Sequence, residues 1–110
     1  MSKPVRILPS IPPSALADVM PCVITVQPMS AEELSKVKEA ICYIRHPPTV
    51  QLLGSIIPRL QPGGQEAKIQ DGEAFIVVSL RSRTATSGQD VEVQSLSDLI
   101  VAKCTVKRIK

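Results

Sequence analysis

The chain of 110 residues has the length of one domain with a single hydrophobic core. Its apolar fraction of 44% and charged fraction of 21% exclude a disordered or fibrous chain. A net charge of +3, with one Phe, one Tyr and no Trp, provides neither the broad positive surface nor the stacking rings typical of proteins that bind long nucleic acids. We therefore expect no long nucleic acid as a partner, whereas a small anionic ligand is compatible with this charge.

The cysteines and the hydropathy indicate the compartment of the protein. Cys22, Cys42 and Cys104 are far apart and odd in number, and the chain has one histidine, so neither a disulfide framework nor a zinc site is predicted. No segment approaches the roughly 18 to 20 apolar residues of a membrane helix, and the first residues lack the pattern of a secretion signal. We expect buried thiols, no metal, no cofactor and no membrane partner, in a cytoplasmic protein.

Prolines delimit the first two predicted strands. Val5–Leu8 is a short apolar run that predicts a strand, and the prolines of residues 9–13 predict a rigid loop after it. Residues 22–26 alternate β-branched side chains between two prolines, a pattern typical of a second strand.

The clearest helix signal comes next. Ser30 and Glu33 have the spacing of a capping box, and the apolar residues behind them predict a helix over residues 31–40. The apolar residues 41–44 leave that helix and lead to His46. The sequence therefore places the only histidine at the start of a new element.

A second helix is predicted directly after His46. Pro47 and Pro48 suit the first turn of a helix, the apolar residues that follow provide one face, and Pro58 ends it. His46 thus lies at or just before a helix N-terminus. Free backbone N–H groups at such a position favour anions, including phosphates.

The second half of the chain predicts a sheet covered by helices. Residues 59–64 indicate a turn, residues 66–69 a short strand, and Asp71-Gly72 a hairpin. The continuous apolar run Ala74–Leu80 predicts a central strand buried on both faces, which requires helices over the sheet. The predicted fold is α+β in one domain, residues 1–110, and it closes with an extended segment, a short helix and a last strand at residues 91–93, 95–101 and 105–109.

His46 is the residue whose context best predicts chemistry. A lone histidine is more often a packed or surface residue than a catalyst, but Arg45 beside it and a helix start behind it suit an imidazole that protonates a leaving oxygen. Arg81 and Arg83 end the central strand two residues apart, so a regular strand points both to one face and Ser82 to the other. They are either phosphate ligands or solvated arginines at a strand end. Motifs of other enzyme classes, such as a nucleophile elbow or a phosphate-binding loop, do not occur.

Two segments resemble a known family. Residues 44–53 read Ile-Arg-His-Pro-Pro-Thr-Val-Gln-Leu-Leu, and residues 70–83 read Gln-Asp-Gly-Glu-Ala-Phe-Ile-Val-Val-Ser-Leu-Arg-Ser-Arg. They resemble the small viral anti-CRISPR ring nucleases, a family first seen as uncharacterised proteins of archaeal viruses, with relatives in phages and bacteria. That family typically shows an Ile-Gly-His-x-x-Thr stretch that opens a helix, followed by a strand that ends in an arginine.

The resemblance implies a homodimer with a mixed sheet flanked by short helices, and a cyclic oligoadenylate, cyclic tetra-adenylate in the family, bound across the dimer interface. That ligand is a second messenger of type III CRISPR systems, and the family cleaves it without metal by attack of a ribose 2′-hydroxyl on the adjacent phosphate. His46 occupies the position of the catalytic histidine. The ligand-binding positions that the resemblance and the strand end indicate are Arg83, Arg45, Thr49 and Arg81. For a viral member, the site of action is the cytoplasm of the host cell.

The chain also departs from the family pattern. The family's Asn near the end of the first strand is Pro9 here, and its Asn-Arg pair before the hairpin strand aligns with Gly63-Gly64. The glycine before the histidine is Arg45, whose charge could replace the missing arginine. The family's Glu after the strand-end arginine has no counterpart in residues 84–88, and the nearest acids that could substitute are Asp90 and Glu92.

Three functions follow from these observations. The first is a ring nuclease that switches off type III CRISPR signalling, with His46 as general acid. The second is a sponge that retains the ring without efficient cleavage, which the missing Glu favours. The third is a scaffold that binds a protein partner and no nucleotide.

Overall fold

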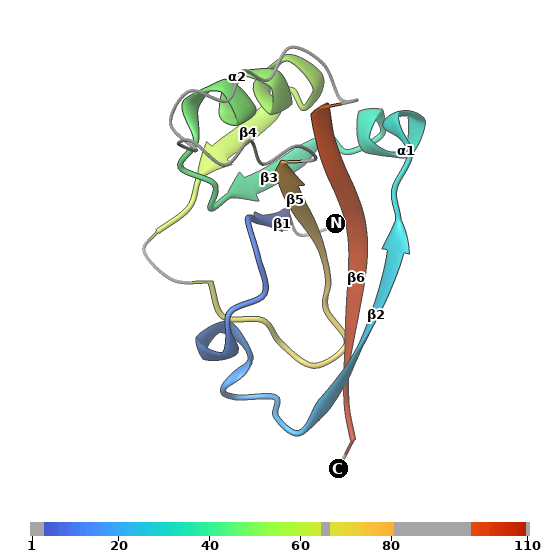
Figure 1. The fold of residues 1–110 in the computed structure, drawn as a ribbon. Coiled ribbons are helices and arrows are strands. Elements are labelled where there is room, and N and C mark those ends of the chain that lie inside the picture. Colours follow the sequence, from blue (N-terminus) through green and yellow to red (C-terminus); the bar gives the residue numbers. More distant parts are fainter. Residues whose placement is uncertain (1–3, 65–66, 81–97, 110) are drawn as a thin grey trace.

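The computed structural model describes residues 4–64, 67–80 and 98–109, which form a mixed six-stranded sheet with two α-helices and one short 3-10 helix (Figure 1). The predicted α+β class with a mixed sheet is thus confirmed. Along the sheet the strand order is β2-β6-β5-β1-β3-β4. The bounds of the elements are β1 Val5–Leu8, η1 Pro13–Leu16, β2 Cys22–Pro28, α1 Ala31–Ser35, β3 Glu39–Cys42, α2 Pro47–Ile56, β4 Arg59–Pro62, β5 Ala74–Leu80 and β6 Leu99–Arg108.

Strand β1 organises the parallel part of the sheet. It pairs in parallel with β3 on one side and with β5 on the other, so that Ile7 is in register with both Cys42 and Ile76. After β1 the chain forms β2 at the far edge of the sheet, then β3 and β4 on one side of β1, and it returns to place β5 on the opposite side of β1. In open α/β sheets such a reversal of strand order leaves a crevice beyond the carboxyl ends of the strands. That edge of the sheet is where the candidate site lies.

The two faces of the sheet each bury one hydrophobic cluster. Leu34 of α1 and Leu53 of α2 pack into the cluster that also contains Ile76. Phe75 belongs to the cluster on the other face, with Leu16 of η1. Because Phe75 and Ile76 are neighbours in β5 and are both almost fully buried, the predicted burial of this central strand on both faces is confirmed.

The helix predicted over residues 31–40 is shorter than expected. The capping box is confirmed: the Ser30 hydroxyl accepts from the Glu33 N–H at 3.1 Å, and the Glu33 carboxylate accepts from the Ser30 N–H at 3.2 Å. However, α1 ends at Ser35, and Glu39–Cys42 forms β3. Pairing with β1 buries Ala40 there, so strand contacts override the helical spacing.

Two predictions for residues 59–69 were wrong. Residues 59–62 are not a turn but strand β4, which pairs in parallel with β3 at the edge of the sheet, where Pro62 is tolerated. Glu66 lies outside the described residues, and residues 67–69 form no strand. Instead, the Ile69 N–H donates to the Ala15 carbonyl at 2.8 Å, and Ile69 is buried against η1.

The end of the chain also differs from its prediction. Asp71 and Gly72 form a turn with Gly72 at φ 81°, but the described residues 67–70 before it form no strand, and the Gly72 N–H donates to the Val106 carbonyl of β6 at 2.9 Å. Residues 91–93 and 95–97 lie outside the described residues, whereas residues 99–101 are strand rather than helix. They pair with the end of β5, so the last strand begins at Leu99 instead of Thr105.

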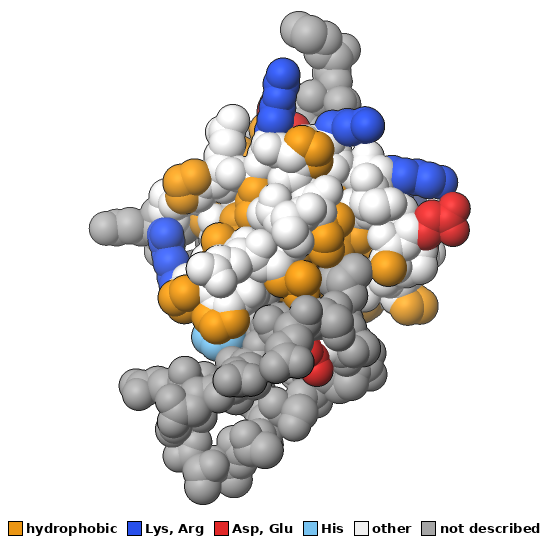
Figure 2. Space-filling model, turned by 90° about the horizontal axis from the view of Figure 1, so that it is seen from above, with side chains coloured by type: hydrophobic (Ala, Val, Ile, Leu, Met, Phe, Trp, Pro, Cys, Tyr) orange, Lys and Arg blue, Asp and Glu red, His pale blue; other side chains and the backbone are white. Residues whose placement is uncertain are grey.

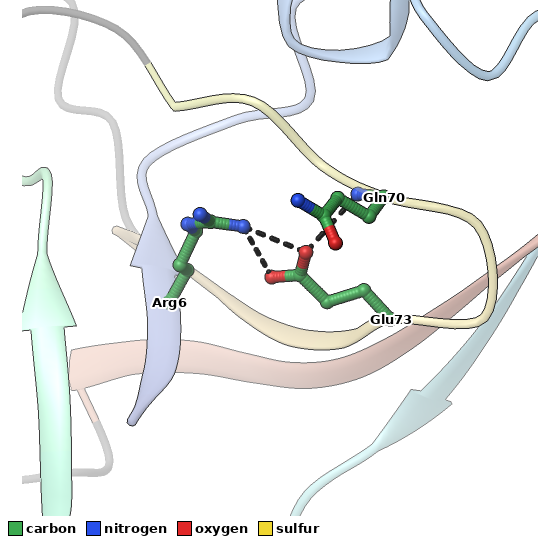
Figure 3. A network of polar contacts seen from close by, with 3 residues as sticks. All are labelled: Arg6, Gln70 and Glu73. Atoms are coloured by element: carbon green, nitrogen blue, oxygen red, sulfur yellow. Dashed lines mark hydrogen bonds and ion pairs between the residues drawn. The ribbon is translucent and has the colours of Figure 1, made fainter. Parts of the chain in front are cut away.

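An ion pair fastens the turn before β5 to strand β1 (Figure 3). Arg6 Nη1 donates to both carboxylate oxygens of Glu73, at 2.6 and 2.7 Å, and Glu73 Oε1 also accepts from the Gln70 N–H at 3.0 Å. Both charged side chains are about three quarters buried, with 25% and 21% exposed. The carboxylate therefore joins two segments that lie 67 residues apart in the sequence.

In the described part of the chain, neither α-helix has the length and apolar character that crossing a membrane would need.

We expect Glu73→Gln to lower the free energy of unfolding by about 1 kcal/mol, because it removes the charge from a partly buried hydrogen-bonded pair. Urea unfolding followed by circular dichroism measures the change. The matched control is Glu32→Gln on α1, since the exposed Glu32 side chain has no bonded partner among the described residues. Equal losses in the two variants would show that the ion pair contributes nothing specific.

A second prediction concerns the thiols. Burial raises the pKa of both Cys42 and Cys104, so less thiolate forms at these positions in mildly alkaline buffer. We expect the half-buried Cys22 to react with a disulfide reagent well before the other two in the native protein. Mass spectrometry of the partly labelled protein identifies the modified residue, and prior labelling of Cys42 or Cys104 would contradict the described packing.

Candidate functional site

His46 is the N-cap residue of α2. Strand β3 ends at Cys42, and the chain then reaches His46 in an extended conformation, with φ −81° and ψ 109°. Pro47 and Pro48 occupy the first two helical positions, where their fixed φ suits the helix and their missing N–H groups break no hydrogen bond. The predicted helix start behind His46 is therefore confirmed.

The imidazole of His46 is held at one nitrogen and unpaired at the other. Its Nδ1 lies 2.8 Å from Oγ1 of Thr49, a hydroxyl on a residue that is only 3% exposed. Its Nε2 is buried and has no hydrogen-bond partner among the described residues. A buried polar atom without a partner is costly, so this nitrogen is the one available for a ligand or for proton transfer.

His46 lines a hollow of about 190 Å³. His46 and Thr49 lie on its α2 side, and Pro9, which directly follows β1, lies on another. The remaining lining comes from the end of β5 and from the segment after β3: Ile44, Val78, Ser79 and Leu80. The hollow thus occupies the crevice that the reversal of strand order predicts at the carboxyl edge of the sheet.

The helix N-terminus offers fewer amides to an anion than expected. Pro47 and Pro48 carry no N–H, and the Val50 N–H already donates to the His46 carbonyl at 3.0 Å. Among residues 47–50, this leaves Thr49 with the one amide that has no partner in the described chain. An anion at this site would therefore depend on side chains more than on backbone N–H groups.

Arg45 points to a different place from its neighbour. It is exposed and does not line the hollow; its Nη2 donates to the carbonyls of Gly64 at 2.8 Å and Gly63 at 3.3 Å. The structure thus brings His46 and Thr49 together but leaves Arg45 outside. The predicted ligand-binding residues Arg81 and Arg83, and the acids Asp90 and Glu92, lie outside the described residues.

A close contact fixes the segment that Arg45 binds. A Cβ atom on Gly63 would lie 2.6 Å from the ring of Tyr43, and the Gly63 N–H donates to the Cys42 carbonyl at 2.7 Å. The absence of a side chain is therefore required there. The sequence analysis placed this glycine in a turn and aligned the Gly-Gly pair with the Asn-Arg pair of the ring nucleases, but it did not predict the contact with Tyr43.

The lining residues without reactive groups were also missed. Pro9 was identified as the start of a rigid loop and as a departure from a family pattern, and Ser79 was not singled out, because neither belongs to a chemical motif. Only the strand order brings them beside His46. Seen from the side of α2 in Figure 2, hydrophobic side chains lie among backbone atoms and other uncharged side chains, and Lys and Arg side chains project near the periphery.

Comparison of the chain with protein-family models, with curated proteins and with solved structures finds no match. Among the described residues, no three His, Cys, Asp or Glu side chains lie close enough together to hold a metal ion.

We expect Gly63→Ala to destabilise the protein by about 1 to 3 kcal/mol, because the added methyl group overlaps the Tyr43 ring. The adjacent Gly64→Ala is the matched control, since a Cβ there meets nothing within 4 Å. Thermal unfolding of the two variants tests the contact. Two equal and small shifts in Tm would mean that Tyr43 does not pack on Gly63.

Proposed function

We propose that the protein is a metal-independent ring nuclease that binds and cleaves a cyclic oligoadenylate, cyclic tetra-adenylate in the first instance. The observation that carries the proposal is the hydrogen bonding of the His46 imidazole. Its Nδ1 is hydrogen-bonded to Thr49, and its Nε2 is buried without a partner among the described residues; His46 lines the hollow at the carboxyl edge of the sheet. A general acid needs such an arrangement, because its donating nitrogen must face the reacting atoms while the ring is held from behind.

The proposed reaction uses the ligand's own hydroxyl as nucleophile. A ribose 2′-oxygen attacks the adjacent phosphorus, the bond between phosphorus and the 5′-oxygen breaks, and protonated His46 gives the proton on Nε2 to that departing oxygen. The 2′-hydroxyl proton leaves to solvent, and a cyclic 2′,3′-phosphate remains on the product. When Thr49 Oγ1 accepts from the Nδ1–H, the imidazolium keeps both protons in defined directions.

The position of Arg45 supports the resemblance at one of its departures. The ring nucleases carry an arginine before the hairpin strand, where Gly64 stands here. Arg45 donates to the carbonyls of Gly63 and Gly64. Its guanidinium charge therefore lies beside the two residues that align with the family's Asn-Arg pair. We propose that Arg45, which lies outside the His46 hollow, supplies the phosphate-binding charge to the part of the ring that extends beyond that hollow.

The size of the hollow favours a ligand shared between two copies of the chain. Pockets for a whole drug-sized ligand occupy about 300 to 1,000 Å³, whereas the described hollow around His46 measures about 190 Å³. A cyclic tetranucleotide has repeated halves, and a two-fold homodimer would present one such hollow to each half. We propose that each subunit binds half of the ring in the cytoplasm of the cell.

A sponge is the second candidate, and the loop sequence favours it. Residues 84–88 contain no acid, whereas the ring nucleases carry a Glu there. A sponge would retain the ring in the same hollow and release no product.

The deciding experiment incubates the protein, with EDTA present, with labelled cyclic tri-, tetra- and hexa-adenylate and follows retention and products separately. We expect cleavage of the tetra-adenylate to survive EDTA, His46→Ala to abolish cleavage while retaining most binding, and Thr49→Val to slow cleavage about tenfold. Retention without product would establish the sponge. Full cleavage by His46→Ala would refute the catalytic assignment, and a need for added metal would refute the mechanism.

Binding is expected to depend on the two strand-end arginines unequally. Arg83→Ala removes the arginine that matches the family position and should weaken retention by about 1.5 to 3 kcal/mol, while Arg81→Ala should cost less. Ring titrations of the two single variants provide each other's control. Light scattering with the ring present should report about twice the 11.9 kDa chain mass, and a monomer with bound ring would contradict the shared site.

A further inference from the structure

A second hollow lies at the opposite edge of the sheet from His46. It is lined by the first residues of all four parallel strands: Val5 of β1, Glu39 of β3, Arg59 of β4 and Ala74 of β5. Its volume is about 830 Å³, within the range of small-molecule sites. We call this hollow the amino-edge groove. None of its lining residues belongs to the His46 hollow.

The lining of the amino-edge groove includes apolar side chains. Val5, Met29 and Val37 are half-buried and expose part of their surface, while Phe75 and Ile76 are almost fully buried beneath. Met29 can adapt its shape because its side chain is unbranched and polarisable. The groove therefore offers contact to the apolar body of a ligand.

Four cationic side chains surround this apolar lining. Lys36 caps the end of α1, Lys38 precedes β3, Arg59 begins β4 and Lys103 lies in β6. All four are exposed, and none of their side chains forms a hydrogen bond or an ion pair with a described residue. Since the four come from different segments, the fold rather than a run of sequence gathers them.

The two carboxylates of the groove balance only half of these charges. Glu33 accepts two hydrogen bonds from Ser30, one from the backbone N–H and one from the hydroxyl, each at 3.2 Å. These bonds, and more weakly the nearby Lys103 and Lys36, lower the pKa of Glu33, so this carboxylate stays ionised while it caps α1. Four cations less Glu33 and Glu39 leave a net charge of +2 in the groove.

We propose that the amino-edge groove binds a small amphipathic anion, a molecule with an apolar body and a single carboxylate, sulfonate or phosphate. The body would cover Val5, Met29 and Val37, and the anionic group would lie among the unpaired cations at the rim. The lysines bind such a group as point charges, and Arg59 can bind it with two hydrogen bonds. This site rests on its own residues and is independent of the proposed ring nuclease activity.

Anilinonaphthalene sulfonate tests the proposal, because it is an apolar dye with one anionic group and fluoresces when bound. We expect one saturable site per chain. Arg59→Glu and Lys103→Glu should each weaken the dye's affinity about three- to tenfold. Lys107→Glu is the matched control: Lys107 is exposed on the same face of β6 as Lys103 and lies outside the groove. The dye should bind Lys107→Glu with the same affinity as the unaltered chain.

A neutral dye separates charge from apolar contact. Phenylnaphthylamine lacks the sulfonate, so Arg59→Glu and Lys103→Glu should leave its affinity unchanged. Decanoate should displace the sulfonated dye, and inorganic phosphate alone should not. Circular dichroism confirms that each variant is folded, which is expected because the altered side chains are exposed.

Three results would overturn the proposal. The first is the absence of saturable binding, and the second is an equal effect of Lys107→Glu. The third is loss of dye binding in His46→Ala, which would place the dye in the other hollow. Failure of ring cleavage with intact dye binding would refute the proposed enzyme and leave this site standing.

Discussion

The parallel pairing of β1 with two neighbours is the constraint on which the rest of the structure depends. Ile7 aligns with Cys42 on one side and with Ile76 on the other, so three strands from distant parts of the chain run in the same direction. Their carboxyl ends must then meet at one edge and their amino ends at the other. Each edge contains a hollow, and the two hollows have different chemistry because different side chains precede and follow the strands.

At the carboxyl edge, geometry and chemistry are linked through the two prolines after His46. They begin α2 at a fixed residue, which holds the imidazole between β3 and the helix, and they also remove two of the amides that a helix N-terminus usually offers to anions. The site therefore has an imidazole with one unpaired nitrogen but little backbone charge. Arg45 follows β3 directly before His46, but its guanidinium lies outside the hollow on the carbonyls of Gly63 and Gly64.

Two contacts outside the His46 hollow hold the sheet and the segment beside Arg45 in place. Arg6 and Glu73 join β1 to the turn before β5, on the side of the sheet where those strands begin. Tyr43 packs on Gly63 beyond the end of β3, and this contact orders the carbonyls that Arg45 binds. None of these four residues lines the His46 hollow.

Local chemistry is what the sequence by itself determined: the capping box of Ser30 and Glu33, the strands at Val5–Leu8 and Ala74–Leu80, and a helix starting after His46. Each depends on neighbouring residues or on a fixed proline geometry. Tertiary structure alone decided that residues 39–42 and 59–62 are strands, because pairing and burial outweigh weak local preference. It also decided which residues surround His46. Pro9 and Ser79 are distant from His46 in sequence, and they lie beside it because β1, β3 and β5 end at one edge.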